Sequence, residues 1–277
     1  MADLSNRSLI NTDLARRILV AFIRDEITRA GLTRAVIGLS GGIDSALSCF
    51  LAAEALGPQN VLALRLPYKS SSPDSLAHAQ LVIDKLGVQS ETIAITDMVD
   101  PILAAIPPDE SKRRGNVMAR ARMIVWYDRS VAFNGLVVGT SNKTEILLGY
   151  STLFGDSAAA INPLGDLYKT QVRQLARALG LPGPILDKPP SADLWEGQTD
   201  EGELGFTYER VDQLLGLLVD QRYRRAELIT AGFDAVFVDR VLTTVRRNQF
   251  KRMPPIIAKL SNRTIGYDFL YLRDWGT

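Results

Sequence analysis

The feature that most constrains this chain is the stretch AVIGLSGGIDSA, residues 35–46. Its apolar, β-branched half is typical of a strand buried on both faces of a parallel sheet. The adjacent Gly41 and Gly42 allow backbone conformations and close approaches that a Cβ would forbid. Asp44 and Ser45 then stand where a helix should begin, and the first N–H groups of a helix stabilise an anion. The stretch therefore predicts a phosphate-binding loop between a strand and a helix.

Two common nucleotide-binding loops do not fit these residues. The stretch has neither the lysine of G-x-x-x-x-G-K-[ST] nor the spacing of G-x-G-x-x-G. A strand-to-helix turn without a ligand remains an alternative. The stretch resembles the loop of the pyrophosphatase-loop ATP enzymes, whose signature S-G-G-x-D-S is matched from Ser40 to Ser45. This resemblance implies that ATP is cleaved between its α and β phosphates, that AMP is transferred to a substrate oxygen, and that pyrophosphate is released.

The composition of the chain limits the classes of partner that we expect it to bind. The chain has 277 residues, 46% of them hydrophobic, and a formal net charge of +1. We expect a single domain over residues 1–277, no general attraction to nucleic acid, and no membrane span, because no apolar stretch approaches the ~20 residues needed. Cys49 is the single cysteine and His78 the single histidine, so a multi-cysteine metal site is excluded. The cysteine usage is compatible with a cytoplasmic location.

Strand and helix patterns alternate along the first half of the chain. The apolar periodicity predicts strands at about 35–39, 61–66, 91–95 and 136–139, and helices at 13–30, 43–56, 72–86 and 116–133. The first of these helices has Leu14, Ile18 and Phe22 at helical spacing. The alternation predicts an α/β fold, a doubly wound parallel sheet with helices on both faces and right-handed crossovers. Ligands then collect beyond the carboxyl ends of the strands, where Ser40, Pro67 and Thr140 follow.

The remaining segments predict loops and a helical end. The polar stretch 107–115 and the Pro- and Gly-containing stretch 181–205 are expected to be mobile, and the second is expected to act as a lid or binding loop. From Thr207 the pattern becomes helical, with Val211, Leu214, Leu215 and Leu218 on one face, and a basic run follows at 246–252. We therefore predict a helical C-terminal part.

Two further motifs sharpen the resemblance to the NAD synthetase family. The stretch GTSNKTEILLGYSTLFGDSAAAINPLGDLYK at 139–169 and PSADLWEGQTDE at 190–201 are similar to stretches that these enzymes share. The resemblance covers about residues 10–270. It implies a Rossmann-like fold of the adenine nucleotide alpha hydrolase type and a homodimer. The implied reaction amidates nicotinic acid adenine dinucleotide to NAD with ATP and ammonia, through an acyl-adenylate.

The resemblance also implies an ATP site with magnesium. Asp44 and Glu145 match the magnesium positions, and a hard cation suits carboxylates beside phosphate oxygens. Glu145 could instead be a glutamate at a helix start, which the helix dipole favours. Lys169 would neutralise phosphate charge, and Asp44, Lys169 and Asp156 would be the catalytic residues. The implied ATP-binding residues are Gly38, Leu39, Ser40, Gly41, Gly42, Ile43, Asp44, Ser45, Arg65, Thr140, Lys169 and Ser191.

Three residues are implied to bind the dinucleotide substrate. Arg120 lies in a stretch similar to the family motif G-N-x-x-A-R-x-R-M, and a guanidinium can hold phosphate or carboxylate oxygens bidentately. Its alternative is a solvated arginine on a helix face. Asp156 matches an aspartate near ammonia and the reacting carboxylate, where it could act as a base. Lys251 matches the lysine of a His-Lys pair near the C-terminus.

The chain departs from the ammonia-using members at three positions. Leu153 replaces a lysine, Ala160 replaces an aspartate, and Phe250 replaces the histidine of the His-Lys pair. Sequence stretches such as N-K-T-E are more similar to the synthetase domain of glutamine-dependent forms. Delivery of ammonia by a separate glutaminase partner therefore remains an alternative. A ligase of this class acting on another carboxylate is the alternative function. A non-catalytic nucleotide-binding protein and a tRNA-thiolating enzyme are disfavoured, the latter because Cys49 falls within a helix.

Overall fold

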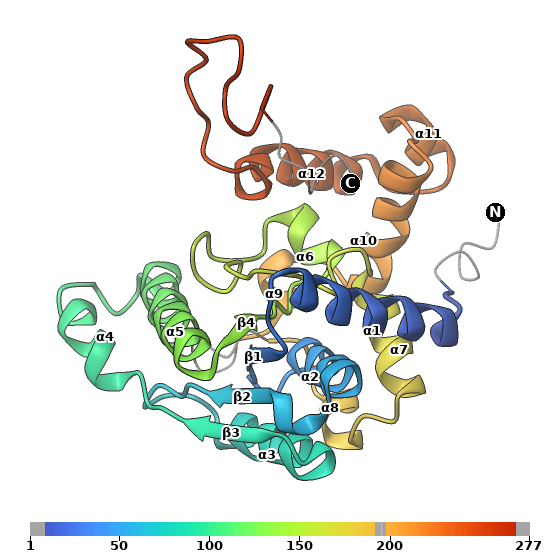
Figure 1. Ribbon diagram of the computed structural model, residues 1–277. Helices are drawn as coiled ribbons and strands as arrows, with labels where there is room; N and C mark the ends of the chain where they lie inside the picture. Colours follow the sequence, from blue (N-terminus) through green and yellow to red (C-terminus); the bar gives the residue numbers. More distant parts are fainter. Residues whose placement is uncertain (1–8, 192–194, 196–197, 270–277) are drawn as a thin grey trace.

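A four-stranded parallel sheet forms the centre of the protein in a computed structural model that describes residues 9–191, 195 and 198–269 (Figure 1). The strand order is β3-β2-β1-β4, and neighbouring strands are all parallel. In register, Val36 lies between Leu62 and Val137. The strands are β1 (Arg34–Gly38), β2 (Val61–Arg65), β3 (Gln89–Thr92) and β4 (Gly135–Val137). The predicted doubly wound fold is confirmed.

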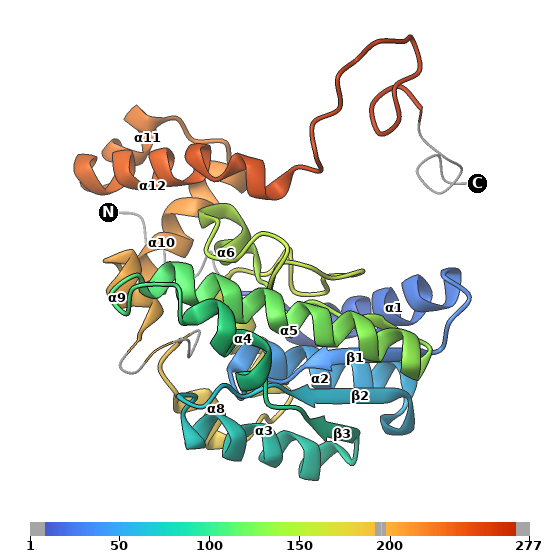
Figure 2. The same ribbon diagram turned by 90° about the vertical axis from the view of Figure 1, so that its left-hand side faces the viewer.

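Helices cover both faces of this sheet because alternate strand residues point to opposite sides. Ala35 and Ile37 of β1 join one buried cluster, whereas Val36 joins another. The first cluster includes α1 (Thr12–Arg29), α2 (Ile43–Leu56), α3 (Pro73–Leu86), α7 (Lys169–Ala178) and α8 (Gly183–Asp187). The second includes α4 (Thr96–Leu103) and α5 (Ser111–Phe133), which lie along the other face (Figure 2).

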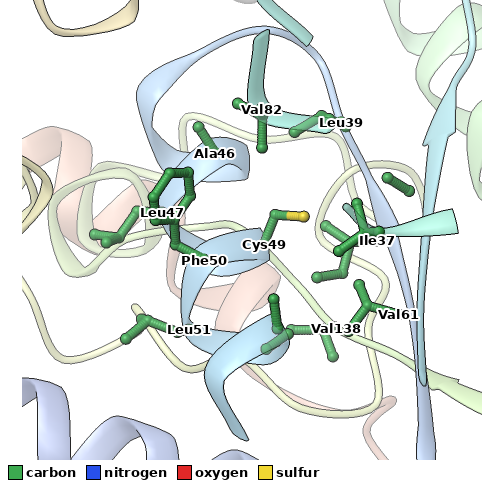
Figure 3. Close-up of a cluster of buried hydrophobic side chains, with 14 of the residues drawn as sticks. Ile37, Leu39, Ala46, Leu47, Cys49, Phe50, Leu51, Val61, Val82 and Val138 are labelled. Carbon is green, nitrogen blue, oxygen red and sulfur yellow. The ribbon is translucent and has the colours of Figure 1, made fainter. Parts of the chain in front are cut away.

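Helix α2 is the most deeply buried helix of the first layer. Figure 3 shows Cys49 of α2 among Ile37, Val61 and Val138, and the Cys49 side chain is fully buried. The helix begins directly after the diglycine turn at its N-cap, Gly42. The core therefore fixes the direction in which the N-terminus of α2 points.

The second half of the chain adds a helical part with its own core. Tyr208, Val211 and Leu214 are buried there, which confirms the predicted helical end and its apolar face. Its helices are α6 (Lys143–Leu148), α9 (Asp200–Leu204), α10 (Tyr208–Leu215), a π-helical turn (Gly216–Asp220), α11 (Arg225–Thr230), α12 (Ala235–Arg247) and a 3-10 turn (Gln249–Arg252). A further 3-10 turn, Pro58–Asn60, precedes β2.

Several element boundaries differ from the sequence prediction. The strand predicted at 91–95 lies at Gln89–Thr92, an exposed edge strand without an apolar pattern, and the buried Ile95 instead precedes α4. The charged stretch 107–115 is partly helical, since α5 begins at Ser111. The stretch 181–205 contains α8 and α9. Helices α4, α6 and α7 were not predicted.

The exposed apolar side chains of the described chain include one face of α1 and a group near its C-terminal end. On α1, Leu14, Ile18 and Phe22 are exposed, whereas Val20, Ile23 and Ile27 face the core, so the spacing seen in the sequence marked the outer face. Residues 253–269 form a C-terminal arm that extends away from the body (Figures 1 and 2). Its exposed apolar residues are Met253, Ile256, Ile257, Leu260, Ile265, Tyr267 and Phe269. None of the helices in the described part of the chain has the length and apolar character required to cross a membrane.

Candidate active site

The loop between β1 and α2 has the backbone geometry of an anion cradle. Gly41 has a φ of 78°, and a Cβ there would collide with the carbonyl oxygen of Ser75 on α3. Ser45 Oγ donates to the Gly42 carbonyl oxygen (3.0 Å) and accepts from the Ser40 backbone N–H (3.2 Å). The serine thus closes the loop around the N-terminus of α2. The first-turn N–H groups of this helix are left for an anion.

Lys169 brings together two carboxylates from distant parts of the chain. Its Nζ lies 2.5 Å from Asp44 Oδ2 on α2 and 3.1 Å from Glu145 Oε1 on α6. The ammonium also lies 5.2 Å from the centre of the Tyr208 ring. The Lys169 side chain is only 3% exposed. The structure therefore places the predicted cation and both predicted metal-binding carboxylates in one cluster beside the loop.

A capping box at the start of α6 orients this cluster. The Asn142 side chain accepts from the Glu145 backbone N–H (3.0 Å), and Glu145 Oε2 accepts from the Asn142 backbone N–H (3.3 Å). The Asn142 amide also donates to Asp44 Oδ1 at 2.9 Å. One buried asparagine thus fixes both carboxylates, because it caps the helix that carries one and donates to the other.

Burial and charge shift the proton affinities in the cluster. Burial raises the pKa of Glu145 to about 7, although the positive charge of Lys169 opposes this. Burial lowers the pKa of Lys169, but the attraction of Asp44 and Glu145 outweighs it, so that the pKa lies above its ordinary value. Lys169 is therefore a charged ammonium, whereas Glu145 is partly protonated near neutral pH, and a further cation beside it would favour the charged form of Glu145.

Helix α10 of the C-terminal helical part holds the backbone of Lys169 in place through hydrogen bonds. Buried Asp212 on α10 accepts from Thr144 Oγ1 (2.6 Å) and from the Thr170 backbone N–H (2.8 Å). Thr144 Oγ1 in turn accepts from the Lys169 backbone N–H at 3.0 Å. Asp212 thereby joins the starts of α6 and α7, so the C-terminal core sets the position of the lysine.

The stretch after α6 carries a further predicted carboxylate, Asp156. Asp156 Oδ1 accepts from the Thr152 backbone N–H at 2.7 Å, and burial raises the pKa of this carboxyl above its ordinary value. Lys251 Nζ donates to the carbonyl oxygens of Gly149 and Ser151, both at 2.6 Å. Burial lowers the pKa of Lys251, although Asp156 attracts its charge. Lys251 therefore holds the backbone of the stretch that carries Asp156.

One cavity of about 460 Å³ lies at the carboxyl ends of β1, β2 and β4 and collects most of the predicted residues. The predicted residues that line it are Gly38, Leu39, Ser40, Gly42, Ile43, Asp44, Ser45, Thr140, Glu145, Asp156, Lys169, Ser191 and Lys251. Motifs that follow different strands therefore converge, as expected for a parallel sheet.

Three predicted residues are placed elsewhere in the described chain. Gly41 shapes the loop without lining the cavity. Arg65 points to α3, where its guanidinium donates to Gln80 Oε1 at 2.5 Å. Arg120 is exposed on α5, donates to the Leu153 carbonyl oxygen (3.3 Å), and does not line the cavity. Its neighbour Arg122 lines the cavity instead.

Several residues of the cavity were not singled out from the sequence. Asp200 and Tyr150 lie within the two family motifs, so motif membership was an available signal. Asn142 has the pattern of a helix cap three residues before a glutamate. No sequence pattern indicated Lys188 and Trp126 as site residues, because only the fold brings them to the cavity.

These features define the class of the protein. A parallel sheet with a diglycine cradle, followed by a buried lysine between two carboxylates, is the site of a nucleotide-binding α/β enzyme of the pyrophosphatase-loop kind. Comparisons with known proteins identify the family within this class. The sequence profile described as NAD synthase matches residues 15–255, and the chain belongs to that family, whose standard reaction is the ATP-dependent amidation of deamido-NAD.

Individual relatives agree with this assignment. An NH(3)-dependent NAD(+) synthetase from Trichlorobacter lovleyi is 58% identical and covers 98% of this chain and 99% of its own length. The Chlorobaculum tepidum protein of the same name is 57% identical, with 95% of each chain covered. The resemblance seen in the sequence is therefore confirmed, and the chain is an enzyme of this family.

Solved structures show the same fold. The Francisella tularensis structure of an NMN synthetase has a TM-score of 0.81 and 33% identity, covering 91% of this chain and 100% of that one. The NH3-dependent NAD synthetase from Campylobacter jejuni, in complex with nitrate ion, has a TM-score of 0.76 and 31% identity, covering 90% and 100%.

Proposed function

We propose that the cavity forms NAD from nicotinic acid adenine dinucleotide, ATP and ammonia, with the residue roles given below. The observation that carries this proposal is the cluster of Lys169, Asp44 and Glu145 beside the diglycine loop. The loop N–H groups and Lys169 bind the triphosphate and lower its repulsion toward an incoming carboxylate. The nicotinate carboxylate attacks the α-phosphorus, pyrophosphate leaves, and ammonia then displaces AMP from the acyl-adenylate.

Magnesium fits the residues present. Asp44 and Glu145 both contact the Lys169 ammonium, so the two carboxylates lie close together, and a cation beside the ammonium could take a ligand from each. Among the described residues no group of three or more His, Cys, Asp or Glu side chains could hold a metal ion. Mg²⁺ needs no such group, because it is bound through one or two carboxylates with phosphate oxygens and water. When bound, it would neutralise developing charge on the phosphates.

Asp156 is proposed to serve the second half-reaction. Its buried carboxyl has a raised pKa, which brings it closer to the range of an effective general base. There it would keep the attacking ammonia unprotonated. The relatives named NH(3)-dependent support free ammonia as the nitrogen source, without a glutaminase partner.

A homodimer is proposed from the apolar surfaces of the chain. Leu14, Ile18 and Phe22 of α1 form one exposed apolar face, and Ile124, Tyr127 and Val131 form another on α5. The C-terminal arm 253–269 lies on the side of the sheet edged by β4, away from β3 (Figures 1 and 2). These surfaces would be covered by a second copy, with the arm contacting that copy. Exposed Arg120 on α5 would then reach a dinucleotide bound near the interface.

We propose that the protein is a single cytoplasmic domain that covers residues 1–277. The described parts of its stretch 181–205 would close over the site, with Ser191 contributing a hydroxyl to the nucleotide, whereas residues 192–194, 196 and 197 of this stretch lie outside the described residues. The ATP-binding role of Arg65 would require it to leave Gln80.

The deciding experiment measures products. Purified protein with ATP, magnesium and the dinucleotide should form NAD, AMP and pyrophosphate with ammonium, and much less NAD with glutamine. Formation of ADP and orthophosphate would refute the proposed cleavage. Loss of NAD formation in Lys169→Ala would support the role of the cluster.

A second candidate substrate is nicotinic acid mononucleotide. Leu153 and Ala160 lack the charges that hold the dinucleotide in ammonia-using members, and the Francisella tularensis relative is described as an NMN synthetase. The mononucleotide has the same reacting carboxylate but no AMP half. A comparison of kcat/KM for the two substrates decides between them, and a higher value for the mononucleotide would favour the second candidate.

A further inference from the structure

The start of α9 is fastened to the active site by two tyrosines. Buried Asp200 accepts from Tyr208 Oη at 3.0 Å and from Tyr150 Oη at 3.1 Å. Asp200 is 4% exposed, and its hydrogen bond from Tyr208 is buried, whereas the bond from half-buried Tyr150 is partly buried. Hydrogen bonds to a buried carboxylate are stronger than those between neutral groups.

The same aspartate closes the loop that leads to α9. Its backbone N–H donates to the Pro190 carbonyl oxygen at 3.0 Å, so the residues on either side of this loop are joined. Pro190 and its neighbour Ser191 line the cavity together with Asp200. The contacts that hold Asp200 in place therefore also hold Pro190, and with it the adjacent Ser191, at the wall of the cavity.

Tyr150 connects this arrangement to the reacting groups. Its backbone N–H donates to the Glu145 carbonyl oxygen at 2.9 Å, so the tyrosine is held by the end of α6. Its hydroxyl also lies 3.3 Å from Glu203 Oε1, which accepts from Gln198 Nε2 at 2.6 Å. We refer to Tyr150, Asp200, Glu203 and Tyr208 as the α9 clasp.

The clasp borders the cavity, although Glu203 is also exposed to solvent. Tyr150, Asp200 and Glu203 line the cavity that also contains Asp156 and Lys169. Removal of the Glu203 carboxylate or of the Tyr150 hydroxyl would leave the diglycine loop and Lys169 in place, since none of their described contacts passes through these two groups. Triphosphate binding and the position of α9 are thus separable.

We propose that Tyr150 and Tyr208 are positioning residues that keep α9 closed over the acyl-adenylate, so that ammonia attacks it and water does not. This inference rests on the acyl-adenylate chemistry proposed above. When water attacks instead, its oxygen forms a bond to the carbonyl carbon and the bond from that carbon to the AMP oxygen breaks. AMP leaves with the electron pair, the proton passes to solvent, and the carboxylate substrate is regenerated. ATP is then consumed without NAD.

The test measures AMP formed per NAD formed at limiting ammonium. The wild-type ratio should be about one, because a closed site excludes water. In Tyr150→Phe the excess of AMP over NAD should rise by about tenfold, the effect of losing roughly one hydrogen bond to a carboxylate. The ratio should fall back as ammonium is raised, because ammonia competes with water for the same intermediate.

Tyr68→Phe is the matched control. Tyr68 Oη donates to Asp100 Oδ1 at 2.8 Å, the same kind of bond, and does not line the cavity. Its ratio should stay at the wild-type value. Glu203→Ala gives a second measurement that keeps every tyrosine but removes the acceptor for Tyr150 and Gln198, and it should raise the ratio too.

The outcomes separate the clasp from the proposed function. A folded Tyr150→Phe or Glu203→Ala enzyme that is slower but keeps the wild-type ratio overturns the clasp, since a merely structural defect lowers the rate without uncoupling the products. Wild-type protein that forms no AMP from ATP and the dinucleotide overturns the proposed function instead.

Discussion

Asp156 is held so that an asparagine can replace it without losing its local contact. Its Oδ1 accepts from Thr152, and an amide oxygen can accept the same bond. We expect Asp156→Asn to lower NAD formation by about 10²- to 10⁴-fold, the range of a lost general base. Pyrophosphate release in a single turnover without ammonium should change far less. Equal loss of both steps would contradict the proposed base.

Glu145 predicts a pH dependence of stability. Its pKa is raised to about 7 in the folded chain, so between pH ~4.5 and ~7 the native state holds a proton that the unfolded state has released. The free energy of unfolding of the ligand-free protein should therefore fall as pH rises through that window, by about 3 kcal/mol at most.

Urea unfolding of wild type and Glu145→Gln between pH 5 and 8 measures this effect. The difference between the two should grow as pH rises, because glutamine cannot ionise and the charged glutamate is the form that burial penalises. A constant difference across the range would show that Glu145 does not titrate there.

Charged residues of the site were the most predictable from sequence. Asp44, Glu145 and Lys169 stand in ordered motifs, and their charges suit ATP and magnesium, so their type indicates their use. Asp200 and Tyr150 also stand in these motifs, but their residue types do not indicate their use, since it depends on which side chains the fold places opposite them.

At the scale of elements, the capping box of α6 joins stability to function. Asn142→Ala removes the cap of α6 and the donor to Asp44. We expect a loss of about 1 to 2 kcal/mol in the free energy of unfolding and a raised KM for ATP. Urea unfolding and steady-state kinetics measure the two effects.

Thr207→Ala serves as the comparison for this element. Thr207 caps α10 through a bond from the Arg210 backbone N–H and does not line the cavity. Its loss should lower stability by about 1 kcal/mol while the KM for ATP stays unchanged. An unchanged KM in Asn142→Ala would show that Asp44 does not need the amide.

Elements differed in how well the sequence predicted them. The strand at 35–39 and the helix that follows were predictable, because both are mostly apolar and glycines mark the turn between them. The inner face of α1 was not, since Leu14, Ile18 and Phe22 repeat as regularly as Val20, Ile23 and Ile27. Periodicity cannot distinguish two apolar faces of one helix. Short helices such as α6 and α9 depend on caps more than on periodicity.

At the scale of the whole molecule, the C-terminal arm predicts the assembly. Leu260 is 95% exposed and Ile256 is 86% exposed. If a second copy covers them, Ile256→Ser with Leu260→Ser should weaken dimerisation by about 10²-fold or more, since burial of each side chain contributes about 1.5–3 kcal/mol. Sedimentation equilibrium over a range of concentrations measures the constant.

A substitution on the body of the protein controls for general effects of lost apolar surface. Val236 on α12 is 76% exposed, and Val236→Ser should leave the association constant unchanged. An arm variant that associates as tightly as wild type would refute the contact between the arm and a second copy.

The placement of Cys49 has a practical consequence for following the enzyme at work. Its thiol is fully enclosed on α2, and burial raises its pKa to about 12, so at neutral pH almost no thiolate forms. Alkylating dyes react with thiolates and should leave the native chain unlabelled. A cysteine introduced on the surface, for example on α9, would then carry the single fluorophore needed to watch that helix move during turnover.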